Sequence, residues 1–269
     1  MRHPFLDLPH PLVIGHRGAA GECPENTLPS FEQALREGAD ILETDVHATR
    51  DGAVVVCHDD RVDRTTDGSG RIAELRLDEL RRLDAGARFS PDGGRTHPWR
   101  GRGVRIPTLE ELFAHFPEAH VNIEIKAPEA VATTGTLELV ERHGRAARTL
   151  VTAESPETMA RIRGEVHRRG LPVAVGACRD DVAAFLRSAT AGEPPPEGFV
   201  ALQVPAEFGC RPLVTREFVA HAHRHGLEVH VWTINEPEEM QRLLDLGADG
   251  IVTDYPGRLA ALLRERGSR

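Results

Sequence analysis

Seven residues able to perform acid–base, metal or anion chemistry stand at or near the ends of short apolar runs in this chain. They are His16, Arg17, Glu43, Asp45, His58, Glu124 and Lys126. A pair of histidines can exchange protons near neutral pH, since the ordinary pKa of this side chain is about 6.5. Converging carboxylates suit a hard divalent cation such as Mg²⁺ or Ca²⁺, and Arg and Lys hold anions. Together these residue types predict metal-assisted attack on an anionic centre.

The elements that must position these residues alternate almost from end to end of the chain. Short β-branched runs predict strands at residues 12–15, 41–46, 121–125, 150–153, 173–177, 200–204, 228–234 and 250–253. Amphipathic segments predict helices at residues 27–37, 109–116, 129–142, 156–169, 180–188, 215–225, 236–246 and 256–264. About eight strand–helix units is the number in a closed parallel barrel, so we expect an α/β fold of the TIM (β/α)8 class.

One stretch interrupts this alternation. After the second strand the sequence Thr49-Arg50-Asp51-Gly52 marks a hairpin turn, a further strand is predicted at 53–57, and a short helix at 77–83. We therefore predict a single domain over residues 1–269, with an insertion at about 47–107 between the second strand and the second helix. We expect this insertion to pack over the mouth of the barrel and to decide substrate choice.

In such a barrel, functional side chains sit at the C-terminal ends of the strands. Alternation along a strand places Glu43 and Asp45 on one face, and likewise Glu124 and Lys126. Charged groups within apolar strands are costly unless they are paired or bind a metal. The alternative to a metal site is therefore a set of buried ion pairs between these carboxylates and the cations Arg17 and Lys126.

Two other side chains near strand ends have open roles. His47 continues the alternation of Glu43 and Asp45, and it is a candidate to line the mouth of the barrel. Trp232 stands near the end of the seventh predicted barrel strand. It is either a core aromatic residue or part of a wall that contacts substrate, and we include it among the candidate substrate-binding residues.

The composition argues against several classes of protein. A formal net charge of -9 and a pI near 5.9 argue against a general nucleic-acid binder, because no excess of Lys and Arg is present to replace counterions. No apolar run approaches the length of a membrane span, and the first residues lack the apolar core of a signal peptide. The four cysteines are scattered, so they indicate neither a zinc ribbon nor a disulfide framework, and we expect a cytoplasmic location.

A series of short motifs runs in order along nearly the whole chain. The motifs are HRG at 16–18, PENT at 24–27, E-x-D at 43–45, T-x-DG at 49–52, HD at 58–59, EIK at 124–126, WTxN at 232–235 and TDYP at 253–256. In this series, and in the insertion after the second strand, the sequence resembles the glycerophosphodiester phosphodiesterase family. HRG alone is a weak signal, but the ordered set is highly specific.

The resemblance implies a TIM barrel that hydrolyses glycerophosphodiesters, such as glycerophosphocholine or glycerophosphoethanolamine, to sn-glycerol 3-phosphate and an alcohol. In that family the glycerol 2-hydroxyl is thought to attack first, giving a cyclic phosphate that water opens. The implied roles are general acid–base catalysis for His16 and His58, binding of one divalent cation (Mg²⁺ or Ca²⁺) for Glu43, Asp45 and Glu124, and contacts to phosphate oxygens for Arg17 and Lys126.

Three other functions are weighed against this one. A lysophospholipase D, or a phospholipase D of the sphingomyelinase type, would use the same site on a lipid. It would need an apolar surface at the mouth, for which the insertion offers only Phe89, Pro91 and Trp99. A non-catalytic binding barrel predicts missing catalytic groups, and a triad hydrolase predicts a GxSxG elbow, which this sequence lacks. The expected partner is thus a small-molecule phosphodiester, with no nucleic acid and no stable membrane insertion.

Overall fold

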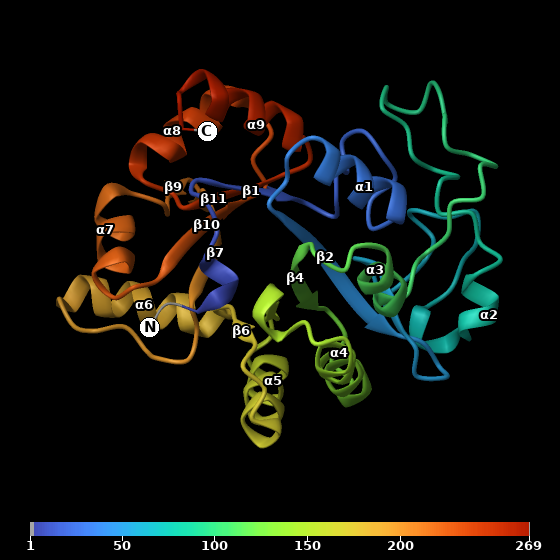
Figure 1. Cartoon of the computed structure of the whole chain (residues 1–269), viewed down its shortest axis with the longest axis horizontal. Coiled ribbons are helices and arrows are strands. Elements are labelled where there is room, and N and C mark those ends of the chain that lie inside the picture. Colours follow the sequence, from blue (N-terminus) through green and yellow to red (C-terminus); the bar gives the residue numbers. More distant parts are fainter. Residues whose placement is uncertain (1–2, 269) are drawn as a thin grey trace.

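Eight parallel strands form a barrel in the computed structural model, which describes residues 3–268 (Figure 1). The strands are β1 (Leu12–Gly15), β2 (Ile41–Ala48), β4 (His120–Ile125), β5 (Thr149–Thr152), β6 (Ala174–Val175), β7 (Ala201–Pro205), β10 (Glu228–Trp232) and β11 (Gly250–Thr253). They pair in the order β6-β5-β4-β2-β1-β11-β10-β7. A parallel bridge between Gly176 and Ala201 links the two ends of this order. The predicted TIM (β/α)8 barrel is therefore confirmed, and residues 1, 2 and 269 of the proposed domain lie outside the described range.

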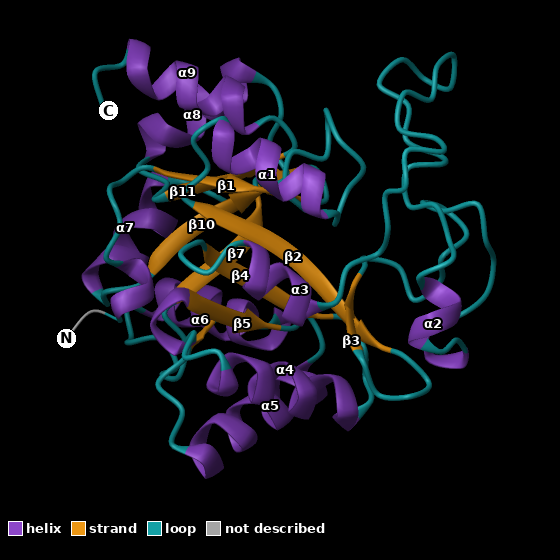
Figure 2. Cartoon of the chain, turned by 45° about the vertical axis from the view of Figure 1, so that its right-hand side comes forward, coloured by secondary structure: helices purple, strands orange, loops and turns teal. Residues whose placement is uncertain are grey.

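The helices that follow the barrel strands lie on the outside of the sheet (Figure 2). They are α1 (Leu28–Arg36), α3 (Leu109–His115), α4 (Ala130–Arg142), α5 (Pro156–Arg169), α6 (Arg179–Ala191), α7 (Arg216–Arg224), α8 (Pro237–Leu246) and α9 (Pro256–Glu265). Side-chain caps start several of them, as when Ser155 accepts a hydrogen bond from the backbone N–H of Thr158 at the start of α5. Each predicted helix is present, with its ends shifted by a few residues.

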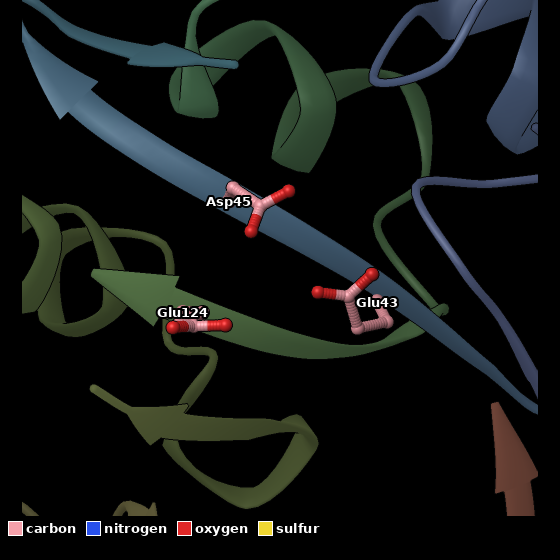
Figure 3. Close-up of side chains that lie close together, drawn as sticks. All are labelled: Glu43, Asp45 and Glu124. Carbon is pink, nitrogen blue, oxygen red and sulfur yellow. The ribbon is translucent and has the colours of Figure 1, made fainter. Parts of the chain in front are cut away.

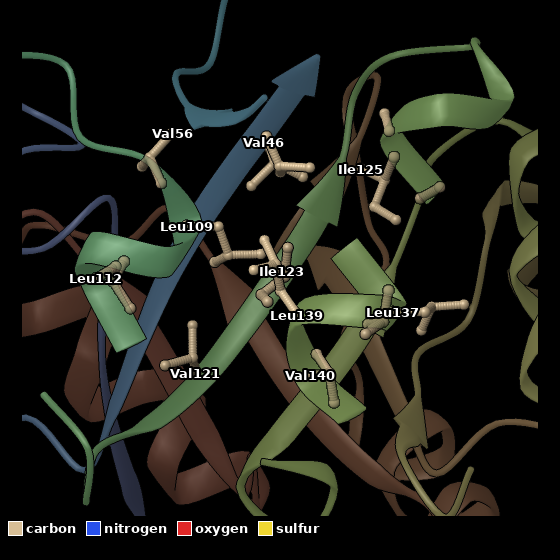
Figure 4. Packing of buried hydrophobic residues seen from close by; sticks show 14 of the residues in the cluster. Val46, Val56, Leu109, Leu112, Val121, Ile123, Ile125, Leu137, Leu139 and Val140 are labelled. Atoms are coloured by element: carbon tan, nitrogen blue, oxygen red, sulfur yellow. The ribbon is translucent and has the colours of Figure 1, made fainter. Parts of the chain in front are cut away.

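Alternation along β4 connects the packing of the barrel to its chemistry. Val121, Ile123 and Ile125 point outward and pack in one apolar cluster with residues of α3 and α4, such as Leu112 and Val140 (Figure 4). Burial of each such side chain stabilises the fold by roughly 1.5–3 kcal/mol. The opposite face of the strand is thereby held toward the barrel interior, and this face carries the polar side chains of the strand.

The chain closes the bottom of the barrel before the first strand begins. A short 3₁₀ helix, η1 (Pro4–Leu6), buries Phe5 and Leu6 against interior residues of the strands. At the same end, where β10 starts, Glu228 pairs with the ring nitrogens of His10 at 2.8 Å and His230 at 2.9 Å. Burial opposes ionisation of Glu228, but these two hydrogen bonds outweigh it and lower the pKa of the carboxyl far below its ordinary value.

Substitution Glu228→Gln is expected to lower the free energy of unfolding at pH 7 by about 1–3 kcal/mol, because it removes the charged acceptor of two buried hydrogen bonds. A carboxyl with a lowered folded-state pKa stabilises the fold above its unfolded value of 4.5 and loses that contribution as pH falls below it. Urea unfolding at several pH values should therefore show a difference from wild type that shrinks in acid. The exposed Glu197→Gln is the control, and a pH-independent difference would contradict this account.

The segment between β2 and α3 leaves the barrel and folds beside it (Figure 2). It contains β3 (Val54–Val56), which pairs antiparallel with β2, then a 3₁₀ helix η2 (Ile72–Glu74) and a short helix α2 (Leu77–Leu80). The segment has an apolar cluster of its own, made of Val55, Cys57, Val62, Ile72, Leu80, Ala85, Val104 and Ile106. The insertion is thus a small packed unit and not an open loop.

A second excursion follows β7 and was not predicted from the sequence. Here β8 (Glu207–Phe208) and β9 (Arg211–Pro212) form a small antiparallel hairpin with exposed residues. Strands this short carry no readable alternation, which explains why the pattern missed them. Among the described residues, no helix combines the length and the hydropathy needed to cross a lipid bilayer.

Candidate active site

Three carboxylates from two neighbouring strands converge inside the barrel. Glu43 and Asp45 lie on β2, and Glu124 lies on β4 directly beside Asp45 in the strand register (Figure 3). Oxygen atoms of the three side chains lie within 4.8 Å of one another. Glu43 and Asp45 are buried, and burial together with the neighbouring Asp45 raises the pKa of Glu43 to about 7. Such a set of hard oxygen ligands fits a divalent cation.

Two cations accompany these carboxylates. Lys126 Nζ lies 2.8 Å from Glu124 and 3.5 Å from Asp45, and Arg17 Nε lies 3.3 Å from Asp45. Burial disfavours the charge of Lys126, but Glu124 and Asp45 outweigh this effect and raise its pKa. The ion pairs considered as the alternative to a metal are therefore present. These ion pairs involve Asp45 and Glu124 and not Glu43, so the ion pairs and a bound cation are compatible.

The HRG motif builds a tight turn directly after β1. Arg17 adopts a left-handed conformation with φ of 50°, and its backbone N–H donates to Glu43 at 2.9 Å. Gly18 follows with φ of 88°, and a Cβ atom at this position would lie only 2.4 Å from the Ser30 hydroxyl oxygen. Only glycine fits there, which explains the third residue of the motif.

The PENT motif orients one of the carboxylates. Asn26 is buried, donates a hydrogen bond from Nδ2 to Asp45 at 3.0 Å and accepts one from the Thr44 hydroxyl at 2.7 Å. Asn26 has a left-handed backbone, with φ of 56°, and its own N–H donates to the carbonyl of Arg17. The role of Asn26 was not predicted from the sequence, and its place in the PENT motif was the only signal that could have indicated it.

His16 is held by a carboxylate from the other end of the chain. Its Nδ1 lies 2.6 Å from Asp254, which follows β11, and Asn235 donates to the second oxygen of Asp254 at 2.7 Å. Burial lowers the pKa of His16, but the bond to Asp254 and the charge of Glu43 outweigh it, so the pKa is raised. Because Nδ1 is occupied, Nε2 is the nitrogen left for a ligand. Asn235, the last residue of the WTxN motif, thus serves this site, and Glu236 is the residue that precedes α8.

His58 has a matching partner that comes from the insertion. Its Nδ1 lies 2.7 Å from Asp59, and Arg64 donates to the same carboxylate. The hydrogen bond from Arg64 lowers the pKa of Asp59 to about 2, so this partner stays ionised. His47, a candidate for the mouth, is not among the residues that line the cavity. Its Nε2 hydrogen-bonds to the backbone carbonyl of His58 at 3.0 Å and thus stabilises the loop that carries His58.

All seven chemistry-bearing residues border one cavity of about 530 Å³ at the C-terminal ends of the strands. The polar part of the lining includes these seven, His16, Arg17, Glu43, Asp45, His58, Glu124 and Lys126, together with Asn122, Thr152, Glu154, Arg179, Gln203 and Thr233. The opposite part is mainly apolar and includes Val182, Leu186, Pro205, Phe208, Leu213 and Trp232, a set that we call the apolar wall. Trp232 is 44% exposed and therefore belongs to the wall of this cavity and not to the core.

The insertion does not cover the mouth as expected. None of its residues from 59 to 107 lines the cavity, and Phe89, Pro91 and Trp99 are absent from the apolar wall. Its own apolar cluster holds the insertion to the side, next to β3. The apolar surface comes instead from α6, the β8–β9 hairpin and the end of β10. A surface assembled from three distant segments is not visible as one feature of the sequence.

Comparison with known proteins agrees with this geometry. The profile of the "Glycerophosphoryl diester phosphodiesterase family" matches residues 16–258. The glycerophosphodiester phosphodiesterase of Caldanaerobacter subterraneus subsp. tengcongensis is 31% identical over 264 residues, which is 95% of this chain and 99% of that protein. Lysophospholipase D GDPD1 of Homo sapiens is 30% identical over 275 residues, covering 93% of this chain and 85% of that protein.

A solved structure extends the likeness to the fold. The phosphodiesterase of Oleispira antarctica, determined in complex with the product sn-glycerol-3-phosphate, superposes with a TM-score of 0.75 at 26% identity. The match covers 95% of this chain and 97% of that one. Sequence, fold and the ordered motifs around one cavity therefore agree. The chain belongs to the glycerophosphoryl diester phosphodiesterase family, and it is a phosphoric diester hydrolase.

Proposed function

We propose that this protein hydrolyses glycerophosphodiesters, such as glycerophosphocholine and glycerophosphoethanolamine, to sn-glycerol 3-phosphate and an alcohol, with the help of a divalent cation. One observation carries the proposal. Two histidines, each with Nδ1 bonded to a carboxylate, line the same cavity as a cluster of three acidic residues. A carboxylate on Nδ1 fixes the ring and presents Nε2 for proton transfer.

In this proposal one histidine removes the proton from the glycerol 2-hydroxyl, which attacks phosphorus, while the other protonates the leaving alkoxide of the head group. Water then opens the resulting cyclic phosphate to sn-glycerol 3-phosphate, with the two histidines again transferring the protons. His16 and His58 are the pair, and Arg17 and Lys126 bind the phosphate oxygens, on which negative charge grows during attack. Glu43, Asp45 and Glu124 hold Mg²⁺ or Ca²⁺, which when bound stabilises that negative charge. Trp232 lies against the substrate from the opposite wall.

The proposal is tested by following both products from a panel of glycerophosphodiesters supplied with Mg²⁺, Ca²⁺ or Mn²⁺. Glycerol 3-phosphate and the free alcohol are expected in equal amounts, measured by a coupled dehydrogenase assay and by chromatography of the head group. Release of a phosphorylated head group would place the cleavage on the other side of phosphorus. That result, or no hydrolysis with any of the panel, would overturn the proposal.

A lysophospholipid is a second candidate substrate, and the apolar wall favours it. Three large apolar side chains at the mouth are exposed: Phe208 at 78%, Trp232 at 44% and Leu186 at 37%. Glycerophosphocholine has no acyl chain to cover them. A lysophospholipid would place its single acyl chain along the apolar wall, while its phosphodiester lies among the same polar residues. The similarity to the human lysophospholipase D also favours a lysophospholipid substrate.

Substitution Phe208→Ser is expected to lower kcat/KM for lysophosphatidylcholine roughly tenfold and to leave glycerophosphocholine turnover unchanged. Burial of a phenylalanine side chain is worth roughly 1.5–3 kcal/mol, and 1.4 kcal/mol corresponds to a factor of ten. Val131→Ser is the matched control, since Val131 is 44% exposed on α4 and does not line the cavity. Equal losses on both substrates, or no turnover of the lysolipid by the wild-type enzyme, would remove the second candidate.

A further inference from the structure

Arg64, in the insertion, uses its guanidinium to join two carboxylates that belong to different parts of the chain. Its Nε and Nη2 donate to Asp59 at 2.7 and 3.1 Å, and its Nη1 and Nη2 donate to Glu25 of the PENT motif at 2.6 and 2.8 Å. Two bidentate contacts from one planar group fix both distance and orientation. The insertion and the loop after β1 are therefore tied together at this residue.

Each of these carboxylates also holds a residue of the active site. Asp59 accepts from His58 Nδ1 at 2.7 Å, and Glu25 accepts from Arg17 Nη1 at 2.8 Å. Arg17 in turn lies 3.3 Å from Asp45. A continuous chain of charge-assisted contacts thus leads from a candidate proton-transfer group, through Arg64, to a candidate phosphate-binding group and the acidic cluster.

The other arginines at the start of the insertion show that this arrangement is specific to Arg64. Arg61 pairs with Asp63, and Arg71 pairs with Asp60, and all four of these side chains are at the protein surface. Among residues 3–268, neither arginine forms an ion pair with a residue that lines the cavity or with a partner of one. The hydrogen bond from Arg64 also lowers the pKa of Asp59 to about 2, so the acceptor of His58 remains charged at any working pH.

We propose that Arg64 is a positioning residue that fixes His58 and Arg17 relative to each other, acting on His58 through Asp59 and on Arg17 through Glu25. The proposal rests on the proposed function, which gives these two residues their roles. Misplacement of a reacting group by about 1 Å can cost a factor of roughly 100 in rate. Lysine retains the charge, but its ammonium is a compact group without the planar fork of arginine, so it cannot hold both carboxylates in register.

Arg64→Lys and Arg64→Ala are expected to lower kcat by roughly 10- to 100-fold and to raise KM for glycerophosphocholine. Arg71→Ala, which breaks an exposed pair in the same insertion, serves as the matched control and should leave both constants unchanged. The effect on kcat and the effect on KM should separate in double variants. In an Asp59→Asn background Arg64→Lys should lower kcat no further, and in a Glu25→Gln background it should raise KM no further.

Two further measurements separate positioning from loss of structure and from failure of the proposed function. Guanidinium ion at millimolar concentration should restore part of the activity of Arg64→Ala and none of that of His58→Ala. ¹⁵N NMR of the His58 ring reports its hydrogen-bonded Nδ1 without any turnover, and that signal should be lost in Arg64→Ala and kept in Arg71→Ala. The proposal would be overturned by an unchanged His58 Nδ1 signal in Arg64→Ala, by additive effects in the double variants, or by wild-type kcat and KM in Arg64→Ala. The NMR outcome decides the proposal even if glycerophosphodiesters are not the substrate.

Discussion

Replacement of either His16 or His58 by alanine is expected to lower kcat by roughly 10²–10⁴-fold, which is the contribution of a positioned general acid or base. The two rings share one feature, a carboxylate bonded to Nδ1, at 2.6 Å in His16 and 2.7 Å in His58. In each ring Nε2 is therefore the nitrogen available for proton transfer at the cavity. The measurement is glycerol 3-phosphate release under saturating substrate, with circular dichroism to show that the variants are folded.

The control for this experiment is His223→Ala. His223 is an exposed histidine that also pairs with a carboxylate, Asp249, at 2.8 Å, but it lies on α7 outside the cavity. Its substitution should leave kcat within a factor of two. A loss smaller than about tenfold in His16→Ala or His58→Ala would exclude that residue from proton transfer. A large loss in both, with a bell-shaped pH profile in the wild type that loses one limb in each variant, is the expected outcome.

The second large effect is expected from the acidic cluster. Asp45→Asn should abolish detectable turnover and weaken binding of Mg²⁺ or Ca²⁺ beyond measurement by calorimetry, because it removes the most buried of the three convergent carboxylates proposed as ligands. In the wild type, EDTA should remove the activity and added cation should restore it. Full activity in the presence of EDTA would contradict the proposal that the enzyme needs a divalent cation.

Measurements of thermal stability test cation binding by the same acidic cluster independently of activity. Two carboxylates buried next to each other repel, so Glu43→Gln is expected to raise the melting temperature in EDTA while it removes the stabilisation that the wild type gains from added cation. The exposed Glu157→Gln on α5 is the control and should behave as the wild type in both conditions. A Glu43→Gln variant that the cation still stabilises fully would show that Glu43 is not a ligand.

Much of this fold could be predicted from the sequence because local pattern and final structure agree. Each barrel strand is a short apolar run, and each outer helix repeats its apolar residues at helical spacing. The alternation of Glu43 with Asp45 was readable for the same reason, since side chains two apart share a face of a strand. The barrel rule then placed His16 and Glu124 at the same end of the molecule.

The partners of the active residues could not be predicted in this way. Asp254 reaches His16 from the far end of the chain and accepts a second hydrogen bond from Asn235, and Arg64 reaches Glu25 across 39 positions. Such contacts depend on which strands become neighbours and on where loops turn, and neither leaves a local period in the sequence. The expectation that the insertion covers the mouth was wrong for a related reason. An apolar cluster within the insertion holds it against β3, beside the barrel.

The division of the cavity into a polar half and the apolar wall has a consequence for how this enzyme can diversify. In the proposed mechanism the chemistry rests on side chains from the first three strands of the barrel and the segments that follow them, whereas the wall rests on α6, residues 205–213 and β10. Changes in residues 205–213 can therefore alter what is accepted without disturbing how it is cleaved. A mutant library confined to that hairpin would explore substrate range at nearly constant catalytic power, which makes this scaffold a practical starting point for tailoring phosphodiesterases to new head groups or chain lengths.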